Sequence, residues 1–168
     1  MSGRVRGVGV DTVDLGAFAA SLAEPGTRFT EMFSPTERRQ CRERAEARSS
    51  VPDAAPRSSV PAASPRSSVP AASREDPLAR HLAGRWAVKE AVIKAWSAAL
   101  YGSPPPIAPD LLRWSEIETV CDAWGRPAVR LSGEVARQVA ATVGENVRWN
   151  VSLSHDGSSA VAFVVLEA

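Results

Sequence analysis

Residues 76–100 carry the pattern that most constrains the fold of this 168-residue chain. Pro77 suits the first turn of a helix, and Gly102, followed by prolines at 104–106, ends one. Between them, apolar residues supply a core-facing side: Val88, Ala91, Val92, Ala95 and Ala99. The pattern predicts one long central helix.

The same helix carries a polar stripe. Trp86, Glu90 and Lys94 are spaced four residues apart and share one face, and Arg85 and Lys89 form a second basic row beside them. A carboxylate among cations, in so apolar a helix, can hold a metal ion against a phosphate. The alternative is a surface Glu–Lys pair, which adds only about 0.2–0.5 kcal/mol. The helix alone favours this alternative, so other segments have to decide.

The flanking segments predict five strands and three further helices. Ser34, Pro35 and Glu37 form a capping-box start, and Asp14 and Ser132 stand at two other N-cap positions. Strands are expected at residues 5–13, 117–122, 128–131, 147–154 and 159–166, and helices at residues 15–22, 38–48 and 133–143. This order predicts a single α+β domain, with a small antiparallel sheet packed against the long central helix.

Composition restricts the function. Hydrophobic residues make up 44% of the chain, and a net charge of +1 excludes broad attraction to nucleic acid or an anionic membrane. Cys41 and Cys121 lack metal-binding spacing, so free thiols in a reducing cytosol are expected. With no signal pattern and no window of 18 apolar residues, the sequence predicts a soluble, cytoplasmic protein.

Residues 48–73 contain a repeat. Arg-Ser-Ser-Val-Pro recurs at 48–52, 57–61 and 66–70, a period of nine. This composition cannot bury enough apolar surface to offset the entropy of ordering, and nine residues are too few for a solenoid unit. We therefore expect a disordered insert of polyproline character within the domain. The alternatives are a ligand for a proline-reading partner and a scaffold role.

Four segments can carry chemistry, and each is weak alone. Gly9-Val-Asp11 ends a strand in an acid that can equally cap a helix. The Gly-Arg-Pro at 125–127 can be turn chemistry only, and His155 can simply hydrogen-bond its own turn. The fourth segment is the central helix with Glu90. The Gly-x-Gly at 7–9 lacks the third glycine and the βαβ unit of a dinucleotide site.

In this order and spacing, the four segments resemble the holo-(acyl-carrier-protein) synthase family, the small phosphopantetheinyl transferases. The strongest match is Gly84-Arg-Trp-Ala-Val-Lys-Glu-Ala-Val-Ile-Lys94, which is similar to the family signature Arg-(Phe/Trp)-Ala-x-Lys-Glu-(Ala)-x-x-Lys. Gly9-Val-Asp11, Gly125-Arg-Pro127 and Ser152-Leu-Ser-His155 are similar to the other family marks. The resemblance covers residues 5–47 and 74–166.

The resemblance implies an enzyme that moves 4′-phosphopantetheine from coenzyme A to a serine of an apo acyl carrier protein, leaving adenosine 3′,5′-bisphosphate. Asp11 and Glu90 match the family's magnesium ligands. Magnesium is usually held by one or two carboxylates plus substrate phosphate, so two acids suffice. The nucleophile belongs to the partner, and a carboxylate or a metal-bound water is the expected base.

The resemblance also implies a catalytic and coenzyme-binding set. Glu90, Lys94 and His155 are its catalytic candidates. Lys94 is placed to pair with a phosphate oxygen, and Arg85 and Lys89 with the same diphosphate or with the ribose 3′-phosphate. The remaining positions expected near the coenzyme are Gly125, Arg126, Pro127 and His155. Short family members are homotrimers, in which a neighbouring chain would supply these last four residues to the Asp11–Glu90 pair.

One departure bears on the partner. Many family members carry Arg-Phe where this chain has Ala17 before Phe18. Carrier docking is then left to other cations, and the candidates are Arg28, Arg38, Arg39 and Arg42. A GC-rich branch of the family shares this loss and serves a large fatty acid synthase, which points to a carrier domain of a type I synthase.

The alternative function is a catalytically silent module that binds coenzyme A or a carrier protein. The missing arginine motivates it. Retention of Asp11, Glu90 and Lys94 argues against it, because a pure binder does not need a metal pair.

Overall fold

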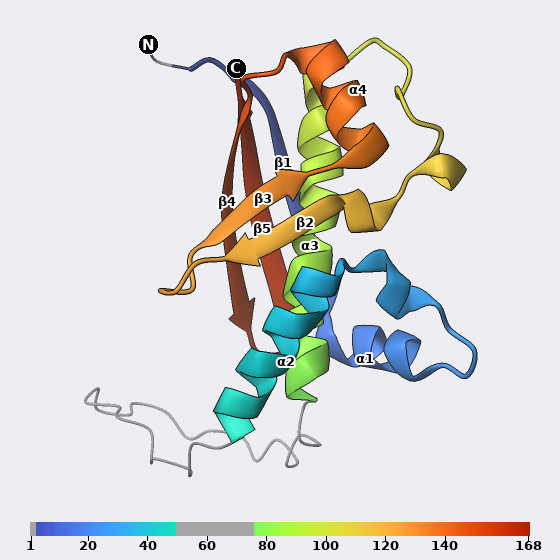
Figure 1. Cartoon of the computed structure of the whole chain (residues 1–168), viewed down its shortest axis with the longest axis vertical. Helices are drawn as coiled ribbons and strands as arrows, with labels where there is room; N and C mark the ends of the chain where they lie inside the picture. Colours follow the sequence, from blue (N-terminus) through green and yellow to red (C-terminus); the bar gives the residue numbers. More distant parts are fainter. Residues whose placement is uncertain (1–2, 50–75) are drawn as a thin grey trace, which may run out of the picture.

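The computed structural model describes residues 3–49 and 76–168. Figure 1 shows the elements in the predicted order: β1 (Val5–Asp14), α1 (Leu15–Ala23), α2 (Pro35–Ser49), α3 (Pro77–Ala99), β2 (Ile117–Cys121), β3 (Pro127–Leu131), α4 (Gly133–Val143), β4 (Arg148–Asp156) and β5 (Ser159–Glu167). Three 3₁₀ helices that the patterns did not indicate are η1 (Phe29–Met32), η2 (Pro109–Leu111) and η3 (Trp114–Glu116). Helix α2 continues through Ser49, and the rest of the predicted insert lies outside the described residues.

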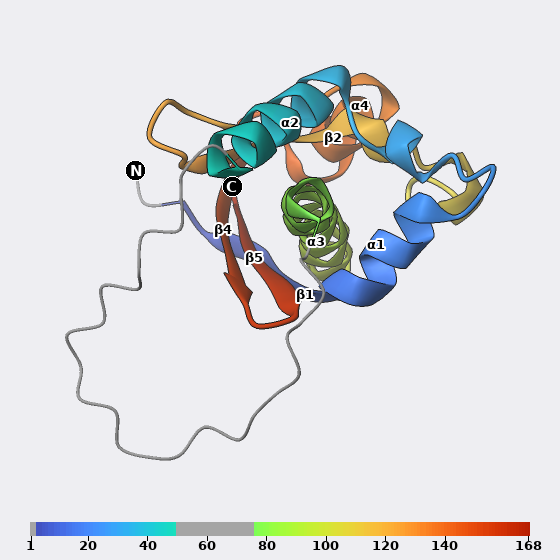
Figure 2. The same cartoon turned by 90° about the horizontal axis from the view of Figure 1, so that it is seen from below.

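The antiparallel strands form two sheets around the central helix. Strands β1, β5 and β4 make a three-stranded sheet in that order, and β2 pairs with β3. Seen along α3, the three-stranded sheet covers one side, while α1, α2 and the β2–β3 hairpin surround the others (Figure 2). The predicted α+β class is therefore confirmed. None of the helices described is long and apolar enough to span a bilayer.

Strand β1 lies against α3 through two glycines. A Cβ atom on Gly7 would collide with the carbonyl oxygen of Ala95, and one on Gly9 with that of Ala91. The Gly-x-Gly pattern therefore permits a close approach of strand and helix backbones. Behind it, β5 completes the core with Ala162, Val164 and Leu166, all fully buried.

Most of the predicted capping residues stand at the N-termini of the helices. The capping box is confirmed: the Glu37 amide donates to Ser34 Oγ (3.1 Å), and the Ser34 amide donates to the Glu37 carboxylate (2.9 Å). Asp14 caps α1 by accepting from the Ala17 amide at 2.8 Å. Ser132 stands at the N-cap position of α4 as expected, but its side chain makes no capping hydrogen bond. The Val135 amide in the first turn of α4 instead donates to the carboxylate of Glu116.

A fully buried ion pair joins three elements. Lys89 Nζ lies 2.8 Å from Glu37 Oε2 and also donates to the carbonyl oxygens of Trp114 and Ile117. The second Glu37 oxygen accepts from the Thr119 amide at 2.9 Å. Burial lowers the pKa of Lys89, and the Glu37 charge opposes that shift. The pair thus satisfies backbone groups on the free edge of β2 and fixes α2 and α3 against it.

We predict that Lys89→Met strongly destabilises the protein, because it leaves the Glu37 carboxylate buried without a counter-charge. Breaking a buried pair in this way costs about 3–5 kcal/mol. Urea denaturation followed by circular dichroism measures the change in unfolding free energy. Adding Glu37→Gln should recover part of the loss, since an amide needs no counter-charge.

The matched control is Arg39→Met, which removes one partner of the exposed Arg39–Glu43 pair. It should change the unfolding free energy by about 1 kcal/mol or less. Equal stability of the Arg39 and Lys89 variants would contradict the structural role of the buried pair.

Candidate active site

Asp11 and Glu90 line one pocket between β1, α1 and α3. The alternation of β1 turns Gly7, Gly9 and Asp11 toward α3, so the glycine contact brings Asp11 up to the helix. The pocket has a volume of about 360 Å³, and its other walls include Ala17, Ser21, Phe29 and Trp86. The predicted meeting of the two acids therefore occurs within one chain.

Lys94 closes one side of this acid pair. Its Nζ lies 2.7 Å from Asp11 Oδ1 and 3.0 Å from the carbonyl oxygen of Val10. The pKa of Glu90 is raised by burial and by the nearby Asp11 charge, while Lys94 acts in the opposite direction. Loss of hydration is thus the main cause of the raised Glu90 pKa, and the charge of Asp11 adds to it.

The chemistry of these donors fits a divalent cation. The described residues include no group of three or more His, Cys, Asp or Glu side chains that could hold a metal. Asp11 and Glu90 nevertheless offer hard oxygen donors from two elements, and the Lys94 ammonium shows that Asp11 and the Val10 carbonyl already hold a cation. Two carboxylates suit magnesium when substrate phosphate and water complete its coordination.

Arg85 and Lys89 do not line this pocket, so the expectation that they meet phosphate groups is wrong for the folded chain. Lys89 is fully buried on the Glu37 side of α3, and Arg85 is only 2% exposed. Arg85 Nη2 contacts Cys121 Sγ at 3.2 Å. The second basic row of α3 therefore points toward α2 and β2, because those elements cover that side of the helix.

His155 lies away from the acid pair within one chain. Its Nε2 is 2.9 Å from the carbonyl oxygen of Arg80, and its ring packs where Gly84 leaves room. Across the sheet, Asp11 pairs with Ala162, which pairs with Leu153, so His155 stands two strands over and two residues further along. It does not share a pocket wall with Asp11 or Glu90.

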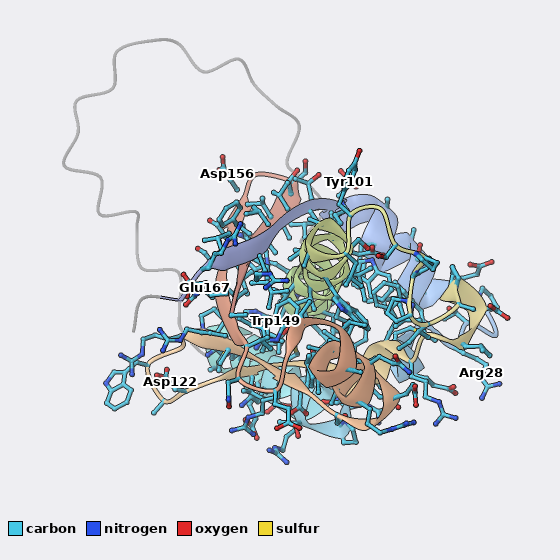
Figure 3. The ribbon with its side chains drawn as sticks, turned by 90° about the horizontal axis from the view of Figure 1, so that it is seen from above. Arg28, Tyr101, Asp122, Trp149, Asp156 and Glu167 are labelled. Atoms are coloured by element: carbon cyan, nitrogen blue, oxygen red, sulfur yellow. The ribbon has the colours of Figure 1, made fainter. Side chains whose placement is uncertain are left out.

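The Gly-Arg-Pro motif forms the β2–β3 turn. Gly125 has a φ of +87°, a conformation that favours glycine. Arg126 Nε lies 2.6 Å from Asp122 Oδ2, and its guanidinium carbon is 4.9 Å from the centre of the exposed Trp124 ring. Pro127 begins β3. Arg28 lines a hollow that adjoins the acid pocket, and Figure 3 places Asp122 on the opposite side of the molecule from Arg28. A single chain therefore does not bring this turn to the pocket.

Sequence reasoning missed an apolar trough that starts at Glu90. Ile93, Ser97 and Leu100 continue the Glu90 face of α3 along one wall. The opposite wall comes from the segment after α3 and includes Pro105, Pro106, Ile107, Leu112 and Trp114. The cavity measures about 440 Å³. Its sequence signal was the spacing of three, seven and ten residues from Glu90, which reads equally well as core.

These features define a class of site. Two facing carboxylates, a half-exposed ammonium group and an apolar trough suit a substrate that combines phosphate groups with an uncharged arm.

Comparison with known proteins identifies the family. Residues 7–164 match the model of the 4′-phosphopantetheinyl transferase superfamily, and the chain belongs to that family. It is 42% identical to a holo-(acyl-carrier-protein) synthase of Corynebacterium glutamicum over 95% of this chain and 96% of the relative, and 41% identical to one of Mycobacterium tuberculosis over 96% of each.

Solved structures agree with this assignment. An ACPS–CoA complex from Chronobacterium ammoniagenes superimposes with a TM-score of 0.74 at 40% identity, covering 96% of both chains. The acyl carrier protein synthase of Mycobacterium tuberculosis gives a TM-score of 0.63 at 33% identity, covering 98% of this chain and 99% of that one. The resemblance inferred from the four motifs is therefore confirmed at the level of family and fold.

Proposed function

We propose that the chain is a magnesium-dependent holo-(acyl-carrier-protein) synthase, which transfers 4′-phosphopantetheine from coenzyme A to a serine of an apo acyl carrier protein. The observation that carries this proposal is the convergence of Asp11 and Glu90 on one pocket, with Lys94 at its edge. A silent binding module has no use for this carboxylate pair. Membership of the family and its coenzyme-bound relative support the same activity.

The reaction needs positioning and charge stabilisation more than covalent help. The carrier serine oxygen forms a bond to the β-phosphorus of the diphosphate. The bond from that phosphorus to the bridging oxygen breaks, its electron pair leaves with adenosine 3′,5′-bisphosphate, and the serine proton passes to a base. Magnesium held by Asp11 and Glu90 would supply charge neutralisation for the diphosphate and the leaving group. Lys94 donates to a phosphate oxygen from the next turn of α3.

The trough fits the uncharged arm of coenzyme A. Its helical wall runs from Glu90 to Leu100, about 15 Å at 1.5 Å per residue. The pantetheine arm, built of short amide-linked units, spans a similar length of roughly 14 Å when extended. Because the trough starts at Glu90, an arm lying in it keeps the diphosphate beside the acid pair.

The carrier protein would approach over α1 and η1. A second hollow, lined by Ser21, Thr27, Arg28, Phe29 and Trp86, shares three of these residues with the acid pocket. Arg28 is exposed and pairs with Glu31 at 3.0 Å, so an acidic carrier surface can compete for it. Of the four predicted docking cations, Arg28 is the one that lines this hollow beside the acid pocket. A type I fatty acid synthase carrier domain and a cytoplasmic location complete the proposal.

We infer that the active enzyme is a homotrimer with shared sites. The sheet face turned away from α3 exposes Val8, Val10 and Phe163, and the last two are cross-strand partners. Exposed apolar patches of this kind mark interaction surfaces. A neighbouring chain packed there would bring its Arg126 turn and His155 toward the acid pair, which has neither within its own chain.

The activity is tested by the mass of a carrier protein. With coenzyme A and magnesium, an apo carrier should gain about 340 daltons, the mass of the transferred group carrier. We predict that Glu90→Gln lowers the rate about a hundredfold or more, because a lost metal ligand removes several kcal/mol of charge stabilisation. The exposed Glu43→Gln is the control and should retain full activity. No mass gain on either a free fatty acid carrier or a type I carrier domain would contradict the proposal.

The trough is tested by filling it. We predict that Ser97→Trp raises KM for coenzyme A about tenfold or more, equivalent to about 1.4 kcal/mol of binding, since the indole would occupy the arm's position. Ala98→Trp adds the same side chain one residue away, outside the trough, and should leave KM unchanged. Steady-state kinetics with coenzyme A varied would measure both. Equal KM values for the two variants would place the arm elsewhere.

Shared sites are tested by mixing inactive variants. We predict that Glu90→Gln and Arg126→Ala, refolded together, regain activity at roughly a quarter of the sites, the statistical share for random cyclic assembly. Glu90→Gln mixed with Asp11→Asn should stay inactive, because every chain then lacks one acid of the pair. Recovery in neither mixture would show that the turn and the acid pair do not act across chains.

A further inference from the structure

Lys94 is paired with Asp11, one of the two carboxylates that would have to bind a metal ion. Its ammonium group lies 2.7 Å from Asp11 Oδ1 and 3.0 Å from the Val10 carbonyl oxygen. The Asp11 side chain is only 16% exposed, whereas that of Lys94 is 51% exposed. The acid is thus held in place by the fold, and its counter-ion sits on a flexible stem that reaches solvent.

This arrangement opposes a metal ion that arrives alone. A divalent cation between Asp11 and Glu90 would share an Asp11 oxygen with a positive charge a few ångströms away, and like charges at that distance repel. The low exposure of the Asp11 side chain limits screening of this repulsion. Lys94 therefore neutralises Asp11 and makes the site a poor one for a metal ion when no coenzyme A is bound.

Binding of the phosphopantetheine donor, coenzyme A, would remove this obstacle to metal binding. Phosphate oxygens are strong acceptors for an ammonium group. Lys94 is one helical turn beyond Glu90, so a diphosphate held beside the acid pair lies within reach of its stem. Once the ammonium turns to the phosphate, Asp11 is released.

We propose that Lys94 is a positioning residue that makes metal binding at Asp11 and Glu90 conditional on the diphosphate donor. Without donor, the ammonium holds Asp11; with donor, it moves to a phosphate oxygen and Asp11 becomes available. The inference rests on the proposed function, because it takes the acid pair as the metal site. By linkage, donor and metal must then strengthen each other's binding by the same factor.

The test measures Mn²⁺ binding, with the ion as a paramagnetic substitute for magnesium, by the electron paramagnetic resonance signal of free Mn²⁺. In the wild-type protein, coenzyme A should increase Mn²⁺ affinity strongly, and pantetheine, which lacks the diphosphate, should not. Lys94→Met should bind Mn²⁺ about fivefold or more tightly without donor, and the effect of coenzyme A should shrink accordingly. Lys94→Arg, which keeps the charge, should bind donor-free Mn²⁺ as weakly as the wild type.

Three variants complete the design. Arg39→Met removes an exposed cation away from the pocket and should leave Mn²⁺ binding unchanged. Asp11→Asn and Glu90→Gln should abolish Mn²⁺ binding with and without donor. If they do so while Lys94→Met binds like the wild type, the metal site stands and the role of Lys94 is overturned. If neither acid variant affects Mn²⁺ binding, the metal site and the inference that rests on it both fail.

Discussion

The candidate site depends on how closely β1 approaches α3. Side chains larger than hydrogen at Gly7 and Gly9 would meet the helix backbone at Ala95 and Ala91. Because strand residues alternate, the spacing that buries the two glycines also turns Asp11 toward the helix. Separation of strand and helix by the width of one methyl group would draw Asp11 away from its partner, and a magnesium site tolerates little displacement because its geometry is demanding. The packing requirement and the chemical requirement thus fall on one short segment.

The polar residues of α3 serve two different neighbours. Glu90 and Lys94 face the pocket, where partial exposure lets them exchange partners. Lys89 faces the interior, where its three hydrogen bonds, to Glu37 and to the carbonyl oxygens of Trp114 and Ile117, hold it in one place. Adjacent residues on a helix differ in direction by about 100°, so one turn can present a structural charge and a chemical charge to different neighbouring elements. A rigid pair behind the helix then sets the rotation at which Glu90 meets Asp11.

The order of elements and the capping box could be predicted because each leaves a local signal, either periodicity or a cap residue. The pairing of Asp11 with Glu90 was instead implied by the resemblance to the family, because the two acids lie far apart along the chain. Arg85 and Lys89 were misplaced, because helical spacing tells which residues share a face but not which neighbour covers that face. Glu37, the partner of Lys89, lies 52 residues earlier, and nothing local connects the two. The cap at Glu116 was missed for the same reason, since it joins two separate elements. The trough beside Glu90 was missed because its helical spacing is equally typical of a buried core face, and nothing local shows how the segment after α3 folds back along it.

The remaining motif residues show what a single chain leaves unfinished. Arg126 is held by Asp122 and Trp124 at an exposed turn, and His155 is held by the first half of α3, so both are ordered without touching the acid pair. Ordered side chains can meet a neighbouring chain's substrate with little loss of conformational entropy. The exposed valines of β1 offer the apolar surface that would bring such a neighbour close. In the homotrimer that we propose, one chain would supply the charge that holds the diphosphate and the next would supply groups that bind the rest of the coenzyme, so assembly and catalysis would depend on the same strand.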